Sequence, residues 1–330
     1  MIPLSVLDLA PIVEGSDARQ SLQNSRALAR RAEELGYTRY WLAEHHNMPG
    51  IASAATSVMI AYVGEGTTRI RLGAGGVMLP NHAPLQIAEQ FGTLDAIFPG
   101  RIDLGLGRAP GTDQLTAHAL RRTLVGGEDR FPRDVLELQA FLAPEQAGQR
   151  IRAVPGAGSS VPLWILGSST FGAQLAAMLG LPFGFASHFA PDSLMQALAI
   201  YRERFQPSAQ LDKPYAMCGY TVVAAATDEE AQFHYTSAQI GFANQRRGMP
   251  GKLPAPRAGF DAELRPEERA QMEQMRYFSA VGSPETVKRK LDEFVALTQA
   301  DELIITSHMY DHAARLRSYE IVADAWGLKP

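Results

Sequence analysis

The sequence predicts an α/β fold, a single (β/α)8 TIM barrel that spans residues 1–330 as one domain. Three observations lead to this fold class. Short apolar runs of strand length alternate with longer runs of helical periodicity, which implies parallel strands with both faces buried. Eight such units favour a closed barrel over the alternative, a doubly wound open sheet. No linker-like change of composition divides the chain, so a single domain is expected.

The first half of the chain supplies four strands and three helices. Apolar, β-branched and aromatic residues mark strands at residues 2–9, 38–43, 70–76 and 102–106. Ser16 is expected to cap the first helix, which Gly36 ends. The next two helices are expected at residues 53–64 and 84–97, the second one ended by Pro99 and Gly100.

The second half continues the alternation. Strands are expected at residues 162–166, 182–187, 217–225 and 302–306, and helices at 134–142, 171–179, 191–205 and 313–326. Two further helices begin after the capping residues Thr227 and Ser283. Residues 242–275, rich in Gly and Pro, are expected to form an insertion between the seventh and eighth strands of the barrel, and to act as an active-site lid.

Composition and charge exclude several classes of protein. Lys and Arg number 31 against 35 Asp and Glu, a net charge of −4, so the chain has no basic field for nucleic acids. A single cysteine, Cys218, cannot form an internal disulfide and indicates a reducing compartment. The N-terminus lacks the early positive charge of a signal peptide, and no apolar stretch reaches 18 residues. A cytoplasmic protein without a membrane span is therefore expected.

In a parallel barrel the chemistry lies where strands end and the chain turns toward a helix. This rule selects a set of positions before any family is considered. The set comprises Asp8, Glu44-His45-His46, Gly75-Gly76, Gly107-Arg108, Gly167-Ser168-Ser169, Ser187-His188 and Thr306-Ser307-His308.

The histidine pair after the second strand has two interpretations. Successive side chains of an extended backbone point to opposite sides, so His45 and His46 are poorly placed to bind one metal ion. One of them can face the mouth and exchange a proton near neutral pH. The other interpretation is a hydrogen-bonded loop histidine without a catalytic role.

The third to fifth strands end in residues suited to a phosphate and a flat ring. Gly75 and Gly76 permit close approach of a ring system, or they serve tight packing at a barrel corner. Arg108 can grip a phosphate, or it can pair with a carboxylate. The Gly167-Ser168-Ser169 turn opens a helix whose amides can hold an anion, or its hydroxyls only cap that helix. Together they suggest a mononucleotide such as FMN.

Four stretches in order along the chain carry a resemblance to a known family. With them the sequence resembles the bacterial luciferase-like monooxygenases, among their single-chain relatives. The stretches are WLAEHHN (41–47), RLGAGGVMLPNHAPLQIAEQFGTLDAIFPGRIDLGLGRAPG (71–111), LWILGSSTFGAQLAAMLGLPFGFASHFAP (163–191) and ELIITSHMYDHAARLRSYEIVAD (302–324).

The resemblance implies specific roles for residues of this chain. His45 matches the active-site histidine, and Gly75-Gly76 matches a non-proline cis peptide bond. Arg108 matches the phosphate-gripping arginine, and the turn of Gly167, Ser168 and Ser169 matches the phosphate-binding turn. Such enzymes take reduced FMN as co-substrate from a separate flavin reductase. They react it with oxygen, and the resulting flavin peroxide oxygenates a small organic substrate.

The sequence departs from the light-emitting subunit of that family at two positions. Ser168 stands where that subunit has a carboxylate, and Gly107 stands where it has a cysteine. Light emission is therefore not expected. Relatives often form dimers through the second and third helices, so a homodimer is expected.

Three other functions stay open on the sequence alone. One is a deazaflavin-dependent dehydrogenase of the same superfamily, and another is a flavin-binding protein without turnover. The third is a metal-dependent barrel hydrolase built on His45, His46 and His188, which lacks a convincing carboxylate and His-x-His arrangement. No resident metal is therefore expected.

Overall fold

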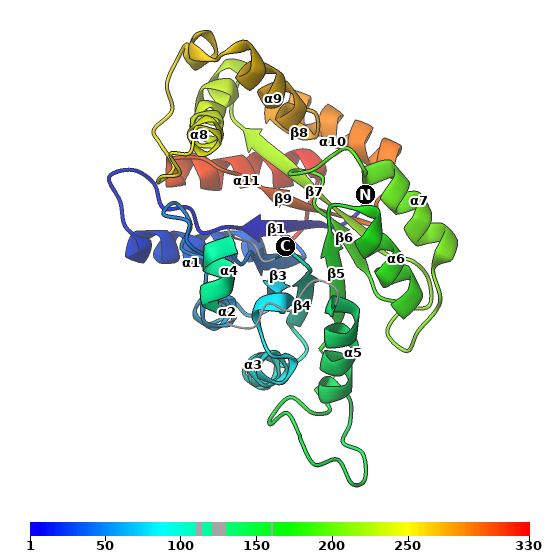
Figure 1. Cartoon of the computed structure of the whole chain (residues 1–330). Helices are drawn as coiled ribbons and strands as arrows, with labels where there is room; N and C mark the ends of the chain where they lie inside the picture. The colour runs from blue at the N-terminus through cyan, green and yellow to red at the C-terminus, as the bar shows by residue number, and fades with distance from the viewer. Residues whose placement is uncertain (110–113, 121–129, 160) are drawn as a thin grey trace.

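The computed structural model describes residues 1–109, 114–120, 130–159 and 161–330. It confirms the predicted closed barrel of eight parallel strands, with β9 pairing to both β7 and β1. Figure 1 views the barrel with its helices arranged around the strands. The barrel strands are β1 (Leu4–Asp8), β2 (Arg39–Leu42), β3 (Arg71–Met78), β4 (Ile102–Gly107), β5 (Leu163–Gly167), β6 (Phe183–Phe185), β7 (Ala216–Ala224) and β9 (Glu302–Thr306).

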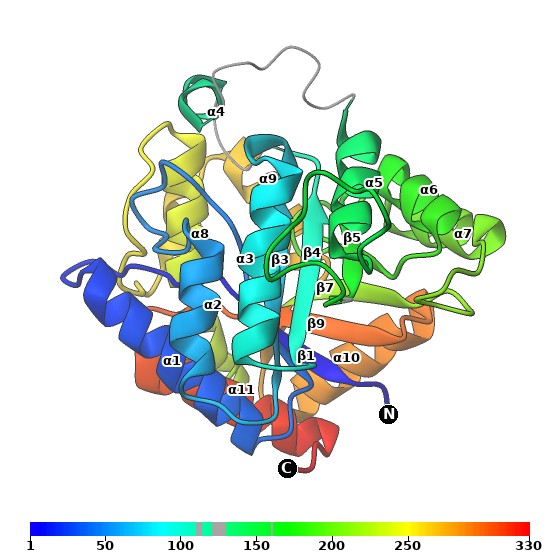
Figure 2. The ribbon, with the colours of Figure 1, turned by 90° about the horizontal axis from the view of Figure 1, so that it is seen from below.

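The described helices surround the barrel, and most of them cover its outer face. They are α1 (Ala18–Glu34), α2 (Thr56–Gly64), α3 (Pro84–Ile97), α4 (Gln114–Leu120), α5 (Phe131–Leu142), α6 (Thr170–Leu179), α7 (Leu194–Arg204), α8 (Asp228–Arg246), α9 (Pro266–Arg276), α10 (Pro284–Thr298) and α11 (His312–Trp326). Two short 3₁₀ helices are also present: η1 (Leu79–Asn81) lies between β3 and α3, and η2 (Phe260–Glu263) lies between α8 and α9. In Figure 2 α4 lies at the end toward which β4 points, and both termini lie at the opposite end.

The structure adds a ninth strand that the sequence did not predict. β8 (Ser279–Gly282) pairs with residues 221–224 of β7, beyond the residues of β7 that pair with β6. Thr221 is in register with both Ser279 and Thr306, so β8 and β9 lie on opposite sides of β7. Four residues of small side chains give too short an apolar run to be read as a strand.

The predicted insertion at residues 242–275 lies between β7 and β8. It is not structureless, because it contains the end of α8, all of η2 and most of α9. Arg247 of this segment forms two hydrogen bonds with Glu268 of α9, at 2.7 and 2.8 Å. Whether the segment acts as a lid stays a proposal.

Helix starts agree with the sequence at some positions and differ at others. Thr227 and Ser283 cap α8 and α10 through their side chains, as predicted. Ser16 does not cap α1, because Asp17 accepts the hydrogen bond from Gln20 N–H at 2.9 Å. Ser53 does not begin α2; its hydroxyl donates to the carbonyl oxygen of Ala43 instead, and the helix begins at Thr56.

The N-terminal end of the barrel is closed by a buried ion network. Arg39 of β2 contacts Asp103 of β4 at 2.7 Å and Glu302 of β9 at 3.0 Å. Arg71 of β3 contacts Asp103 at 2.6 Å, and the hydroxyl of Ser5 donates to Glu302. Asp103 and Glu302 are fully buried, so each depends on its partners to compensate for lost hydration.

Above this network the barrel interior is apolar. Side chains from five of the strands fill it, namely Leu7, Trp41, Trp164, Met217 and Ile304. The rings of Trp41 and Trp164 pack edge to face at 5.2 Å between centroids. The interior is therefore a packed core, and the open end at the strand C-termini is where a ligand can approach.

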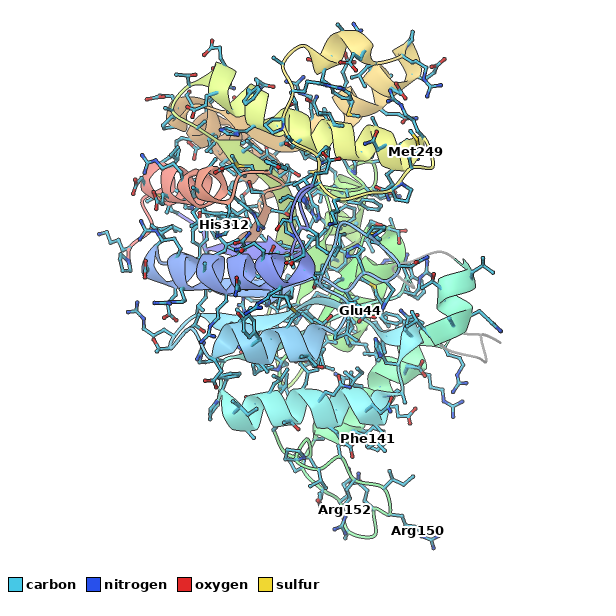
Figure 3. All side chains as sticks on the ribbon, turned by 90° about the vertical axis from the view of Figure 1, so that its left-hand side faces the viewer. Glu44, Phe141, Arg150, Arg152, Met249 and His312 are labelled. Carbon is cyan, nitrogen blue, oxygen red and sulfur yellow. The ribbon has the colours of Figure 1, made fainter. Side chains whose placement is uncertain are left out.

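The connection between α5 and β5 projects away from the barrel. Figure 3 shows this projection below the helices, with Arg150 and Arg152 labelled on it. Gly156 of this connection packs so closely on Gly92 of α3 that a Cβ atom at either position would meet backbone. In the part of the chain that the structure describes, no helix is long and apolar enough to cross a membrane.

Candidate active site

The strand ends selected from the sequence lie together at the C-terminal mouth of the barrel. Parallel pairing places the ends of β2, β3, β4, β5 and β6 at one rim. In Figure 3 Glu44 lies toward the side of the molecule that carries α4. The mouth is therefore lined by residues that are far apart in the chain.

Glu44 is the centre of a hydrogen-bond network at this mouth. Its Oε1 atom is 2.8 Å from His46 Nε2 and 2.8 Å from His82 Nε2. Its Oε2 atom accepts from the backbone N–H of Met78 at 3.1 Å. Burial alone would raise the pKa of Glu44, but hydrogen bonds from His82 and His46 hold that pKa below its ordinary value. The network ties the end of β2 to the end of β3.

Sequence reasoning missed His82 and the role of Glu44. His82 lies in the turn after η1 and belongs to no strand end. The sequence hinted at this network only through Glu44, an acidic residue directly before the histidine pair. A buried carboxylate needs donors, but one sequence does not reveal which distant residue supplies them.

His45 lies close enough to two further histidines, His188 and His308, to affect their pKa values. Its Nδ1 atom is buried and has no hydrogen-bond partner among the residues that the structure describes. Burial lowers the pKa of His45, and the Glu44 carboxylate opposes that change. His45 in turn contributes to lowering the pKa values of His188 and His308. The backbone N–H of His45 donates to Ser53 O at 3.0 Å, so the catalytic role of its ring stays a prediction.

The corner at Gly75-Gly76 has the backbone form that the resemblance implied. The peptide bond between these two glycines is cis. A Cβ atom at Gly75 would meet Leu7 and Trp41, and one at Gly76 would meet Leu166 and the carbonyl of Gly105. Tight packing inside the barrel is thus a sufficient reason for glycine at both positions.

Arg108 follows β4 and stacks on the first turn of α6. Its guanidinium lies 4.3 Å from the centroid of the Phe171 ring. It forms no ion pair with a carboxylate within the described parts of the chain, so the salt-bridge interpretation fails there. The stacking brings Arg108 next to the helix start that contains Ser169. Phe171 is the residue that sequence reasoning did not identify.

The turn after β5 presents a helix start without a side-chain cap. Ser169 occupies the N-cap position of α6, but its side chain makes no capping hydrogen bond. A Cβ atom at Gly167 would meet only ordinary contacts with Gly172 and Phe183. Ser168 lies between Gly167 and Ser169 in the chain. The capping interpretation is therefore not supported, and the amides at this helix start are available to an anion.

A buried ion pair supports the mouth from below. Asp8 at the end of β1 accepts a hydrogen bond from Arg315 Nη2 of α11 at 2.8 Å and another from Tyr40. Burial would raise the pKa of Asp8, but the Arg315 charge lowers it to about 2. Arg315 Nε also donates to the carbonyl of Ser307 at 2.9 Å, which fixes the loop that carries His308.

The segment after α8 is fastened across the β1–α1 loop. Leu253 N–H donates to Ile12 O at 2.8 Å, and Glu14 N–H donates to Leu253 O at 2.9 Å. Lys252 Nζ donates to the carbonyl of Ser16 at 2.6 Å. In Figure 3 Met249, just before this strap (residues 250–253), lies on the side of the molecule where α4 lies. The strap thus contacts the loop that begins at the mouth.

The histidines do not form a metal centre of the predicted alternative kind. His46 contacts Glu44, whereas His45 lies close enough to His188 to affect its pKa. Apart from the undescribed residues, no three His, Cys, Asp or Glu side chains are placed to hold one ion.

Comparisons with known proteins agree with this arrangement. A sequence profile described as luciferase-like monooxygenase matches residues 2–301. A luciferase-like monooxygenase of Escherichia coli (strain K12) is 54% identical over 323 residues, which cover 98% of this chain and 96% of that protein. An N-acetyl-S-alkylcysteine monooxygenase of Bacillus subtilis (strain 168) is 31% identical, with 98% of each chain covered.

Solved structures share the fold over the whole chain. The crystal structure of apo-MsnO8 matches with a TM-score of 0.94 and 36% identity over 100% of both chains. The FMN complex of the oxygenating constituent of a 3,6-diketocamphane monooxygenase matches at 0.72 and 20% identity, covering 98% of this chain and 96% of that one. An F420-dependent secondary alcohol dehydrogenase matches at 0.69 and 14% identity, with 98% of each covered. With a profile across most of its length and a relative at 54% identity, the chain belongs to the luciferase-like monooxygenase family.

Proposed function

We propose that this protein is a monooxygenase that uses reduced FMN and O2 to oxygenate a small organic substrate, without emitting light. The observation that carries the proposal is the Arg108 guanidinium stacked on Phe171 beside the uncapped start of α6. Two relatives named monooxygenases, at 54% and 31% identity, support the reaction class. A more distant neighbour of the same fold binds FMN.

The residues present fit the phosphate end of FMN. The Arg108 guanidinium forms no ion pair with any described carboxylate, and its contact with the Phe171 ring does not use its N–H groups as hydrogen-bond donors to a carboxylate. Ser168, Ser169 and the first amides of α6 add neutral donors and the positive end of a helix dipole. The ring system would lie toward Gly75-Gly76, where the backbone of β3 carries no side chain.

Bound reduced FMN supplies the electrons that activate O2. The chain's own task is to position the substrate, exclude water and move a proton. His45 is suited to the last task, because burial lowers its pKa and its Nδ1 atom has no partner among the described residues. We propose that the strap at residues 250–253, with the rest of the 242–275 segment, acts as a lid that limits access of water.

The test of the cofactor proposal is a comparison of two flavins. Arg108→Ala should weaken FMN binding by about tenfold or more while riboflavin, which lacks the phosphate, is little affected. Arg26→Ala is the matched control, because Arg26 also stacks on a ring, Tyr62, at 5.2 Å but lies on α1. An equal loss for both flavins would refute the phosphate role of Arg108.

A second variant tests the catalytic role of His45. His45→Ala should lower substrate-dependent oxygen uptake much more than it lowers FMN affinity. If FMN binding collapses to the same extent, His45 is a flavin contact or a structural residue. Titration with deazaflavin F420 and with oxidised FMN separates the two alternatives, a deazaflavin-dependent dehydrogenase and a flavin-binding protein without turnover.

We also propose a flavin reductase as partner and a homodimer as the assembly. The helices α2 and α3 contact each other and leave Val58 67%, Tyr62 37% and Ile97 50% exposed. Such apolar side chains on neighbouring helices favour self-association. Val58→Glu should convert a dimer into a monomer in sedimentation velocity. A wild-type protein that sediments as a monomer would contradict the proposal.

A further inference from the structure

His188 follows β6, and its ring lies against the backbone of β7. A Cβ atom at Gly219 of β7 would overlap the Nδ1 atom of His188, so only glycine leaves room for the ring. The hydroxyl of the preceding Ser187 donates to Gly219 O at 2.6 Å. Two contacts with one glycine therefore hold the imidazole in a defined place at the mouth.

His188 and His45 share an unusual hydrogen-bond state. The Nδ1 atom of each ring is buried and has no partner among the described residues, whereas Nε2 of neither ring is in this condition. A proton on Nδ1 would bury an unpaired N–H, which proteins rarely do, whereas a proton on Nε2 leaves only an unpaired lone pair buried. Both rings therefore favour the Nε2–H tautomer, whose N–H is on the nitrogen that is not among the buried, unpartnered atoms.

Burial also favours the uncharged form of both rings. Burial, with the neighbouring His308 and His45, lowers the pKa of His188 to about 4. Burial lowers the pKa of His45 against the opposing charge of Glu44. A neutral imidazole in a desolvated site polarises an oxygen by donating a hydrogen bond, without adding a positive charge.

We propose that His188 is a substrate-binding residue that, together with His45, donates hydrogen bonds to a carbonyl oxygen of the organic substrate. This inference rests on the proposed monooxygenase function, and it adds the substrate class to it. Gly219 is the positioning residue, because any side chain there displaces the His188 ring.

Nitrogen NMR of the imidazole rings tests the tautomer first. Two-bond ¹⁵N–¹H spectra of the whole protein should show His188 and His45 as neutral Nε2–H rings at pH 7, and His188 should begin to charge only near pH 4. Assignment comes from His188→Gln and His45→Gln, each of which removes one set of signals. An Nδ1–H tautomer or a charged ring at pH 7 would overturn the inference.

Binding of a ketone and its oxygen-free analogue tests the donor role. We expect wild-type protein to bind cyclohexanone about tenfold more tightly than methylenecyclohexane, the gain of a hydrogen bond to a desolvated oxygen. His188→Leu should reduce the preference to about twofold, and His188→Gln, whose amide N–H replaces Nε2–H, should restore it in part. Gly219→Ala should act like His188→Leu.

The matched control is His234→Leu. His234 on α8 also carries a buried Nδ1 without a partner among the described residues, and α8 packs on β7 and β8. The ketone preference should survive this substitution. The titrations are made with and without FMN. Loss of FMN binding with an intact ketone preference would refute the proposed function alone, whereas an unchanged preference in His188→Leu would refute this inference alone.

Discussion

Replacing Glu44 by glutamine removes the negative charge at a point where several hydrogen bonds meet. In the wild-type protein one carboxylate oxygen accepts from His46 and His82 at 2.8 Å each, and the other accepts from Met78 N–H at 3.1 Å. A glutamine amide keeps one acceptor oxygen and turns the other position into an N–H donor. That donor would face either the Met78 N–H or the two imidazoles.

The loss follows from this geometry. A hydrogen bond to a charged group contributes about 1.5–3 kcal/mol, and a buried donor left unpaired costs about 1–3 kcal/mol. Losing one such bond and weakening the others gives an expected decrease of about 2–4 kcal/mol in the free energy of unfolding at pH 7. For a chain of this length the Tm should fall by roughly 3–6 °C.

Acidification should remove the difference between the two proteins. The folded-state pKa of Glu44 is lowered, so its contribution is complete above the ordinary Glu value and is lost as pH falls through the folded-state value. Urea unfolding of Glu44→Gln and wild type from pH 7 down to pH 3 checks this, with the exposed Glu137→Gln as control. Equal stability at pH 7, or a gap that persists at the lowest pH, would refute the reasoning.

Three further predictions concern other parts of the molecule. Phe171→Leu should weaken FMN binding by about three- to fivefold in fluorescence titrations, the value of an exposed cation–π contact, and leave riboflavin unchanged; an equal change for both would contradict it. Glu302→Gln should lower the free energy of unfolding in urea by about 3–5 kcal/mol because it breaks a buried network, whereas Glu293→Gln, in an exposed pair, should change it by less than about 1 kcal/mol. Similar effects of the two would show that burial does not matter there. Leu253→Pro removes the N–H that fastens the strap, so more hydrogen peroxide should form per reduced FMN oxidised; an unchanged peroxide yield would argue against a lid.

The fold could be predicted because its signals are local and repeated. Strands at the barrel positions and the helix at residues 84–97 follow from apolar periodicity and from Pro and Gly at the ends. The sequence did not reveal β8, because its four residues form a strand through their pairing with β7, and local sequence does not show that pairing. It also placed the cap of α1 at Ser16 instead of Asp17, since two adjacent capping residues are equivalent in sequence.

The strand ends that carry the candidate site could be placed from the sequence, but the contacts of their side chains could not. The rule that chemistry lies at strand ends selected His45, Arg108 and His188, which follow β2, β4 and β6 in the structure; their roles stay predictions. It could not supply partners from helices and turns, such as Phe171 under the guanidinium or His82 on Glu44. Those partners depend on where distant segments meet, and a single sequence carries no record of that.

The charges at the closed end of the barrel also constrain how this protein can be recombined with its relatives. Arg39, Arg71 and Asp103 come from the first half of the chain, and Glu302 comes from its last strand. A chimera that joins half of this barrel to half of another inherits an uncompensated charge in its interior unless the second parent carries the matching one. Designers of such hybrids should therefore transfer all four residues as one inseparable unit.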